Sequence, residues 1–561
     1  MSISAVESER DTLVEVVPLG GVGQFGMNTM AVTASDTTLL LDAGAMFPGL
    51  DHYGVDLAVP DLSFLEETGR QVSAVVLTHG HEDHIGAVPY VWDRIEGPIY
   101  GTPLTLALVA SKLDAHGIDC AGRLVTVAPG ERVTAGAVEI EFIRVTHSMP
   151  DCVAVALHTP AGTIVHTGDF KFDDDPLDGE PLDAPRLAEL GNEGVLALFA
   201  DSTNVARAGH AGSEQDVAGA FEEIFTRTRG KLIVAAFSSS IYRVQMLVSH
   251  AVRYGRKVAL VGRGMRRTAE IAERLGHLAI PPAARIRDRD VSRYRADEVL
   301  CIVTGSQGEP LAALARIAAD AHPHVRIDPG DVVVFSARAI PGNQRAIGRL
   351  KNDIARRGAD IVDDTISPVH VSGHACEEDL KRMLALVRPR CFVPIHGEYR
   401  FLARHAQVAG EAMNGQTAVL MVENGDRIGF DGGGGWVQGS VPVGGVLIDN
   451  AHSGEVDGAV LRERRQLAAG GVVVLLIPLG AQGAARAGVP AVTTSGFVID
   501  READALLAEA PALVQRMIDD APDGERSDHA ALRERVRAGM ERVFRKRTGR
   551  NPLVLPVIVE T

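Results

Sequence analysis

Cysteine is scarce in this chain, and its few copies are not arranged for pairing. The 561 residues include five cysteines, an odd number, and no two of them form a Cys-x-x-Cys motif. This pattern excludes a disulfide framework or a thiolate zinc site as the basis of the fold. A reducing compartment, the cytoplasm, is therefore the expected location.

An excess of positive charge is also missing. The chain has 56 basic and 73 acidic side chains, which gives a formal net charge of −17. This charge excludes a protein whose whole surface is basic and binds nucleic acid for that reason. Aromatic residues make up only 4% of the chain, and Trp92 and Trp436 alone cannot form a base-stacking platform. Any affinity for nucleic acid must come from local groups of arginine and lysine.

Long apolar runs are missing as well. No run reaches the roughly 18 residues that span a bilayer, and the first residues contain no basic stretch followed by an apolar segment. We therefore expect a soluble protein that is neither held in a membrane nor secreted.

The remaining composition is that of an ordinary globular protein, with 46% apolar and 23% charged residues. At about 150 residues per domain, the length suggests several domains. Changes in pattern predict a first domain over residues 1–207 that resumes at 367–440, an inserted domain over 208–366, a linker over 441–454 and a C-terminal domain over 455–561.

The pattern within each domain predicts its class. The first domain begins with short strands between glycine turns, and helices alternate with strands in the insert, which predicts a doubly wound α/β domain. Residues 367–440 are expected to form histidine-rich loops and strands. The C-terminal domain is expected to be a small α+β unit, with strands at 471–477 and 553–559 and helices at 502–520 and 529–545.

One glycine motif invites a different interpretation. Residues Gly21 to Gly26 spell G-x-G-x-x-G after a strand, and Asp42 lies downstream. A dinucleotide site requires a helix that opens at this loop. The segment that follows is rich in β-branched residues and predicts another strand, so a dinucleotide site is not expected.

The strongest chemical signal is Thr78-His79-Gly80-His81-Glu82-Asp83-His84, directly after an apolar strand. His79 and His81 can point at one centre, while Asp83 and His84 can turn toward a second. Imidazole and carboxylate ligands suit zinc or manganese better than copper(I) or an iron–sulfur cluster. The segment therefore predicts a metal site.

Three more ligand-type residues follow predicted strands, and they are His147, Asp169 and His396. A site for two metal ions needs about six or seven ligands. These three residues can complete such a site together with the first cluster.

The order of these residues, HxHxDH followed by His, Asp and His, resembles the metallo-β-lactamase fold over roughly residues 13–207 and 367–440. The resemblance implies an αββα sandwich, of the α/β or α+β class. The ligands that it implies are His79, His81 and His147 for one ion, Asp83, His84 and His396 for the other, and Asp169 as a bridge. Two such ions would lower the pKa of a shared water and stabilise the charge of an in-line displacement. Zinc is the expected metal, with manganese as the alternative.

The insert narrows the resemblance to the β-CASP nucleases and, among them, to the bacterial ribonuclease J family over nearly the whole chain. Asp201-Ser202-Thr203 and Val369 to His374 resemble the first two motifs of that group, and His396 is the third. The further segments that carry the likeness are Phe47-Pro48-Gly49, His166-Thr167-Gly168-Asp169, Thr304-Gly305-Ser306-Gln307-Gly308-Glu309-Pro310, Ile340-Pro341-Gly342-Asn343 and Pro394-Ile395-His396-Gly397-Glu398-Tyr399-Arg400.

The resemblance implies a ribonuclease that acts on single-stranded RNA in RNA maturation and decay. Family members work mainly as 5′-to-3′ exonucleases that prefer a 5′ monophosphate, with endonuclease activity as well. His374 matches the catalytic histidine of the family, and Asp201 matches the acid that orients this histidine or keeps it charged. The metal ligand Asp83 is expected to be needed for catalysis as well. The residues implied for binding the substrate phosphate are Ser239, Ser240, His370, Val371, Ser372, Gly373 and His374. The family commonly has Phe-Ala-Ser-Asn where this chain has Phe237-Ser238-Ser239-Ser240, which leaves the details of the pocket open.

Basic clusters in and beside the insert could line an RNA channel. They are Arg256-Lys257, Arg263 with Arg266-Arg267, Arg345 to Arg357, and Lys381-Arg382 with Arg388 and Arg390. Each cluster alone is equally typical of a solvated helix face. Together they are expected to follow a channel between the insert and the first domain.

The resemblance also concerns assembly. In the family the C-terminal domain supports homodimers and tetramers, and a paralogue could join such an assembly. Asp449 lies near the position where family members can hold a structural divalent ion, such as calcium, although a simple turn carboxylate explains it equally well.

Two alternatives stay open. The first is a catalytically silent RNA-binding subunit of a complex, and the filled ligand positions together with His374 argue against it. The second is a small-molecule metallo-hydrolase such as a thioesterase or lactamase. The long insert argues against the second alternative, because a small substrate does not need an additional domain with basic helices over the site.

Overall fold

A computed structural model provides the structure of this protein, and it describes residues 12–48, 54–120, 122–340, 342–449, 458–479, 488–497 and 501–560. Gly49 and Pro341 of the motifs above, and residues 450–454 of the predicted linker, lie outside these ranges. The chain divides into two compact units, Met1–Phe47 with Ala58–Val446 and Pro48–Leu57 with Leu447–Thr561. Strands β5 (Leu57–Pro60) and β25 (Gly445–Ile448) contain the residues at which the units divide.

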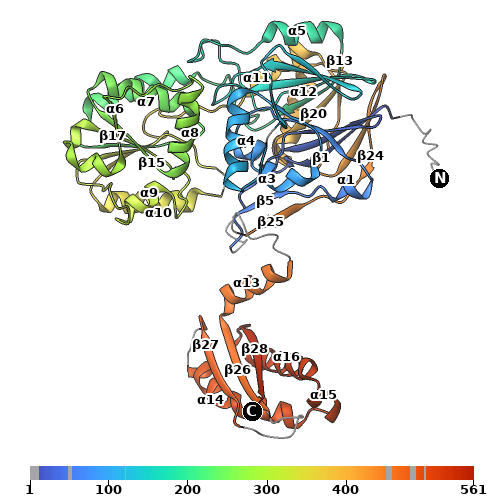
Figure 1. The fold of residues 1–561 in the computed structure, drawn as a ribbon, viewed down its shortest axis with the longest axis vertical. Helices are drawn as coiled ribbons and strands as arrows, with labels where there is room; N and C mark the ends of the chain where they lie inside the picture. The colour runs from blue at the N-terminus through green and yellow to red at the C-terminus, as the bar shows by residue number, and fades with distance from the viewer. Residues whose placement is uncertain are drawn as a thin grey trace. The chain divides into compact units, whose positions relative to one another are not determined.

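Two β-sheets form the centre of the first unit (Figure 1). The first sheet has the order β24 (Gly434–Ser440), β23 (Asp426–Asp431), β1 (Val14–Gly20), β3 (Thr29–Ala34), β4 (Thr37–Leu41), β6 (Val72–Val76), β7 (Ile99–Gly101) and β8 (Leu124–Thr126). The second has the order β22 (Ala418–Val419), β20 (Cys391–Ile395), β13 (Val195–Asp201), β12 (Gly162–His166), β11 (Val153–Thr159), β10 (Val138–Arg144) and β9 (Arg132–Ala135).

One buried core of this unit lies between these two sheets. Leu39 and Leu41 of β4 share a buried cluster with Val153 and Val155 of β11, while Leu40 belongs to a cluster on the opposite face. This alternation follows from the period of two along a strand, which turns successive side chains to opposite faces. Both faces of these strands are apolar, so each sheet needs a cover on its outer side.

Helices provide that cover. The outer face of the first sheet packs on α1 (Ser63–Glu67), α2 (Glu82–Ile85), α3 (Val88–Val91) and α4 (Pro103–Ala115). The second sheet packs on α5 (Ala184–Glu193), α11 (Glu377–Val387) and α12 (Tyr399–Ala412). This order of layers confirms the αββα sandwich.

The expectation for residues 367–440 was wrong in one respect, because α11 and α12 lie there. Leu380, Met383, Leu384 and Val387 of α11 are all buried, and their spacing of three and four is the helical period. This apolar stripe is the signal in the sequence that indicates a helix here.

The insert contains a six-stranded parallel sheet with the order β16 (Arg285–Ile286), β15 (Lys257–Val261), β17 (Val299–Val303), β14 (Leu232–Ala235), β18 (Val332–Phe335) and β19 (Asp360–Val362). One face packs on α6 (Ala218–Arg227), α7 (Ile241–Arg253) and α8 (Arg263–Arg274), and the other on α9 (Ala313–Ala318) and α10 (Gln344–Arg356) (Figure 1). This arrangement confirms the doubly wound insert.

The glycine loop does not open a helix. It contains β2 (Val22–Gly23), which pairs with β21 (Gly397–Glu398), and the next element is the strand β3. A side chain at Gly21, whose φ is +84°, would place its Cβ 2.2 Å from the Asn28 amide oxygen. The loop therefore uses glycine for close packing against Asn28, and the strand predicted after the loop is confirmed.

The second unit is a small α+β domain, as predicted. Its sheet has the order β27 (Ala491–Ser495), β26 (Val472–Leu479) and β28 (Leu553–Glu560). The helices are α13 (Gly458–Gly470), α14 (Arg501–Asp519), α15 (Asp523–Ser527) and α16 (His529–Thr548), and a buried cluster joins α14 and α16 to the sheet. No helix in the described ranges is long and apolar enough to cross a membrane.

In the predicted basic cluster Arg256-Lys257, the first residue has a structural role. Arg256 is 3% exposed, and its guanidinium donates to the backbone carbonyls of Thr228, Gly230 and Val299. It therefore cannot line an RNA channel. Arg263 is exposed and stays a candidate for such a role.

We expect Arg256→Ala to destabilise the insert by about 3 kcal/mol, because three carbonyls would lose a charged donor. Urea unfolding followed by circular dichroism measures the change. Arg263→Ala is the matched control and should stay within about 0.5 kcal/mol of the parent. Equal effects of the two substitutions would contradict the structural role of Arg256.

Candidate metal centre and catalytic pair

The predicted site residues lie at the ends of strands from both sheets. His79 and His81 follow β6, His147 follows β10, Asp169 follows β12 and His396 follows β20. The strands hold these loops at one end of the sandwich. Residues that are more than 300 positions apart in the chain therefore meet.

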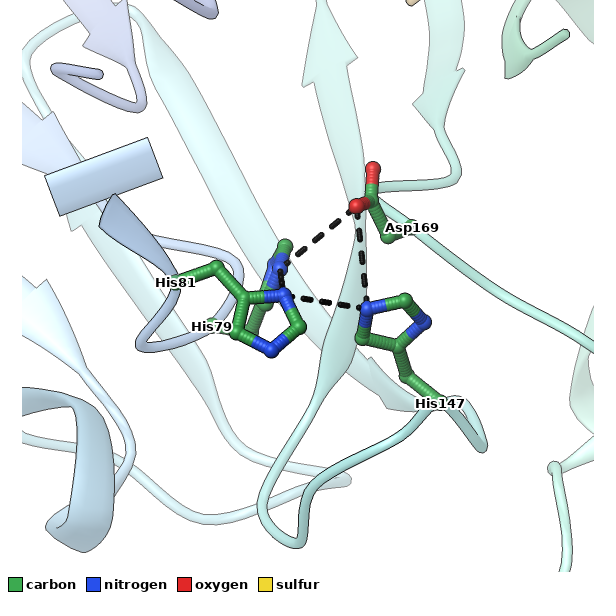
Figure 2. A group of neighbouring side chains, drawn as sticks. All are labelled: His79, His81, His147 and Asp169. Atoms are coloured by element: carbon green, nitrogen blue, oxygen red, sulfur yellow. Dashed lines mark hydrogen bonds and ion pairs between the residues drawn. The ribbon is translucent and has the colours of Figure 1, made fainter. Parts of the chain in front are cut away.

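The first group consists of His79, His81, His147 and Asp169 (Figure 2). His81 Nδ1 lies 3.0 Å from His79 Nε2 and 3.1 Å from His147 Nε2. Asp169 Oδ2 lies 3.6 Å from His79 Nε2 and 3.7 Å from His147 Nε2. Figure 2 shows the three rings with nitrogen atoms turned toward this oxygen.

The second group consists of Asp83, His84, His396 and again Asp169. Here the other oxygen of Asp169, Oδ1, lies 3.3 Å from His84 Nε2 and 3.5 Å from His396 Nε2. Asp83 Oδ2 lies 3.3 Å from His396 Nε2. The two groups contain the same residues that the resemblance assigns to two ions, and their role as ligands stays a prediction.

The second nitrogen of each buried histidine has a partner outside the site. These pairs are His79 Nδ1 with Thr78 Oγ1 at 3.0 Å, His84 Nδ1 with Asp42 Oδ2 at 2.7 Å, His147 Nδ1 with the Gly373 carbonyl at 2.7 Å, and His396 Nδ1 with Thr203 Oγ1 at 2.7 Å. Such partners fix the ring orientation and the tautomer of metal-binding histidines. In all four residues the pairing leaves Nε2 facing the centre.

The donor set fits divalent cations. Asp169 Oδ1 is buried without a hydrogen-bond partner, although buried carboxylate oxygens normally have one. Burial lowers the pKa of His79, and it lowers the pKa of His81 to about 4, which favours the neutral imidazole that ligates a metal. At His84 the carboxylates of Asp169 and Asp42 overcome the effect of burial and raise the pKa, so the second group attracts positive charge.

Asp201 and His374 form a pair beside this centre. His374 Nδ1 donates to Asp201 Oδ2 at 2.8 Å, and Thr203 donates to the other oxygen of Asp201. Burial would lower the pKa of His374, but Asp201 and Asp169 raise it. The His374 side chain is 20% exposed and can therefore present a proton to a bound molecule.

The residues predicted to bind a phosphate lie in two segments. Ser239 and Ser240 directly precede α7, while His370 to Gly373 form the loop that leads to His374. Ser372 Oγ accepts a hydrogen bond from Asn204 Nδ2 at 2.7 Å. Burial, with Arg243 nearby, lowers the pKa of His370 to about 3, so its ring is neutral.

Asp449 belongs to the second unit and forms an ion pair with Arg464. The groups of close metal-type ligands in the described ranges do not include it. A structural ion at Asp449 therefore stays a prediction without support from further ligands.

Sequence reasoning missed several residues that support the site. Asp42 is 1% exposed and accepts hydrogen bonds from Thr78 N, Thr78 Oγ1 and His84. Asn28 Nδ2 donates to the Asp83 carbonyl at 3.0 Å. The available signal for Asp42 was its place directly after the buried strand β4.

Four protein-family models match the chain. They are the metallo-beta-lactamase superfamily over residues 22–235, the ribonuclease J beta-CASP domain over 229–354, the Zn-dependent metallo-hydrolase RNA specificity domain over 359–421 and the ribonuclease J C-terminal domain over 459–561.

Curated relatives resemble the chain over most of its length. The chain is 36% identical to ribonuclease J2 of Bacillus subtilis, with 98% of each chain covered, and 35% identical to ribonuclease J 1 of Streptococcus pyogenes, with 97% of each covered. It is 38% identical to ribonuclease J of Helicobacter pylori over 83% of this chain and 68% of the relative. A crystal structure of a protein of unknown function from Enterococcus faecalis aligns with a TM-score of 0.53 at 16% identity, covering 74% of this chain and all of that one, which shows a shared fold.

We expect Asp169→Ala to lower the bound divalent metal from about two ions per chain to less than one, because both groups lose an oxygen. Mass spectrometry of metals in dialysed protein gives this number, and circular dichroism checks the fold. The control is Asp183→Ala, which removes a carboxylate that caps α5 and should leave the metal content unchanged. Full metal retention in Asp169→Ala would show that this carboxylate is not shared between two ions.

Proposed function

The chain belongs to the ribonuclease J family, and on that premise we propose that it is a metal-dependent ribonuclease that hydrolyses phosphodiester bonds of single-stranded RNA. One observation carries the proposal. The Asp201–His374 pair lies beside two groups of metal-type ligands that share Asp169. Both the hydrolytic centre and a proton donor are therefore available to one substrate.

The ligand groups define what a cofactor would add. Divalent ions held by them, zinc or manganese, would activate water and stabilise negative charge on a phosphodiester. His79, His81 and His147 would hold one ion, and Asp83, His84 and His396 the other, with Asp169 between them. Asp83 is the most exposed residue of the second group, with 34% of its side chain accessible, so a substrate would reach this group from the side of Asp83.

His374 would act on the substrate directly. Its Nδ1 proton is held by Asp201, which leaves Nε2 to donate toward an oxygen of the phosphodiester. Asp201 is 1% exposed and keeps the imidazole both oriented and charged. A charged imidazole there would stabilise the transition state or protonate the leaving oxygen.

We further propose a 5′-to-3′ exonuclease that prefers a 5′ monophosphate and also cuts internally. Ser239, Ser240, His370 and Ser372 would bind the terminal phosphate through short donors, which approach an anion without bulk. A phosphate held at a set distance from the metal centre would allow one nucleotide to be released per step. Maturation and decay of RNA are the processes that such an activity would serve.

RNA would be attracted by local charge. Arg263, Arg266 and Arg267 are exposed on α8, and Arg345 and Arg349 are exposed on α10. These groups can contact phosphates although the chain as a whole is acidic.

We propose that the C-terminal domain supports homodimers or tetramers, with a paralogue as an alternative partner. The five cysteines are all free, as expected for an enzyme of the cytoplasm. A silent RNA-binding subunit and a small-molecule hydrolase are the competing functions that the following assay separates.

With manganese or zinc, the protein should release mononucleotides from 5′-monophosphorylated single-stranded RNA faster than from 5′-hydroxyl or 5′-triphosphorylated RNA. A chelator should abolish the activity, and so should Asp83→Ala. Chromatography of the products measures the outcome. Turnover of nitrocefin or a thioester alone would contradict a nuclease, and RNA binding without turnover would favour the silent subunit.

We expect His374→Ala to reduce cleavage roughly 10²- to 10⁴-fold, as for the loss of a general acid. Asp201→Asn should reduce cleavage less, because the imidazole remains but is held and charged more weakly. Single-turnover rates at saturating RNA measure both effects. His324→Ala, an exposed histidine of the insert, is the control, and a His374→Ala rate near that of the control would exclude a catalytic role.

A further inference from the structure

Arg243 is a buried charge in the first turn of α7. Its side chain is 2% exposed, and its ion-pair partner, Glu214 of the 3₁₀ helix Glu214–Val217, is 5% exposed. The Glu214 carboxylate lies 2.8 Å from the guanidinium. A buried charge of this kind is costly unless all its donors are satisfied, so the surroundings of Arg243 are a fixed part of the fold.

Two further partners satisfy it. Arg243 donates to Ser336 Oγ, directly after β18, and to the Val369 carbonyl at 2.7 Å. Ser336 Oγ itself donates to the same carbonyl at 2.8 Å. The guanidinium therefore joins α7 to the residue that precedes His370.

The loop from Val369 to His374 is held at its other end by the first domain. Asn204 donates to Ser372 Oγ and, at 3.1 Å, to the His374 carbonyl. The Gly373 carbonyl accepts from His147. The insert thus fixes the beginning of the loop, while the metal centre fixes its end.

Arg243 also follows Ser239 and Ser240 by one helical turn. The two segments proposed to bind a 5′ phosphate are therefore connected through this one side chain. We propose that Arg243 is a positioning residue that sets the spacing between these segments and thereby produces the preference for a 5′-monophosphorylated end. The inference rests on the proposed ribonuclease function.

Lysine cannot replace this guanidinium. Arginine presents five donors in a rigid fork, whereas lysine offers one ammonium that cannot reach Glu214, Ser336 and Val369 together. Arg243→Lys keeps the charge beside Glu214 and so tests the spacing rather than the ion pair. Ser336→Ala is a milder variant that removes one donor to the Val369 carbonyl and keeps Arg243.

The experiment compares kcat/KM for two RNAs of the same sequence, one with a 5′ monophosphate and one with a 5′ hydroxyl. We expect Arg243→Lys to lower the ratio of the two values about tenfold and Ser336→Ala to lower it about threefold, because each removes hydrogen bonds from the Val369 carbonyl. The loss should appear mainly in KM for the monophosphorylated RNA, while cleavage of the 5′-hydroxyl RNA stays close to that of the parent. Arg227→Lys, an exposed arginine paired with Glu223 on α6, is the matched control and should keep the ratio.

The outcomes separate this inference from the proposed function. If the unaltered protein cleaves neither RNA, the ribonuclease proposal fails. If it cleaves both RNAs equally, or if the variants keep the ratio, the ribonuclease stands and the role of Arg243 is wrong. An equal loss on both RNAs, or a matching fall in melting temperature with no change of the ratio, would assign Arg243 to stability alone.

Discussion

The position of one carboxylate, that of Asp169, determines the arrangement of the whole site. Its Oδ2 faces His79 and His147, while its Oδ1 faces His84 and His396. A single group can serve two centres only if its backbone is held firmly, and Asp169 follows β12, which pairs with β11 and β13. Gly168 makes the approach feasible, because its φ is +55° and a Cβ there would lie 3.0 Å from Thr78 Cβ and from the Val153 carbonyl.

Sheet register brings the distant parts of the site together. Asp201 ends β13 and is paired with Ile395, the last residue of β20, so His396, which directly follows β20, lies beside it. Thr203 then contacts both Asp201 and His396. The insert separates these strands in sequence, and the site forms only when the chain returns from the insert in this register.

The sequence indicated the chemistry better than the supports around it. His79, His81, Asp83 and His84 are recognisable because four ligand-type residues in six positions are rare by chance. His147 and His396 each follow an apolar segment that predicts a strand. Asp42 also follows a buried strand, but its role depends on partners 36 or more residues away, and the partners of Arg243, which has no local signal, lie between 29 and 126 residues away. Helices α11 and α12 were not predicted, although the spacing of their buried apolar residues is helical. Arg256 was predicted to line an RNA channel, because the sequence does not show which arginines are buried.

The distribution of arginine also reconciles an acidic chain with a polyanionic substrate. Arg243 and Arg256 are buried and satisfied by the protein, so they contribute little to the outer potential. Helix α8, which carries exposed Arg263, Arg266 and Arg267, packs near α4 of the sandwich, and Arg267 lies 4.0 Å from Asp114 of that helix. Charges on the surface are screened over about 8 Å at physiological salt. Acidic residues farther away than this do not cancel the arginines of α8, and the local field that RNA would meet is set by the few side chains where the insert meets the sandwich.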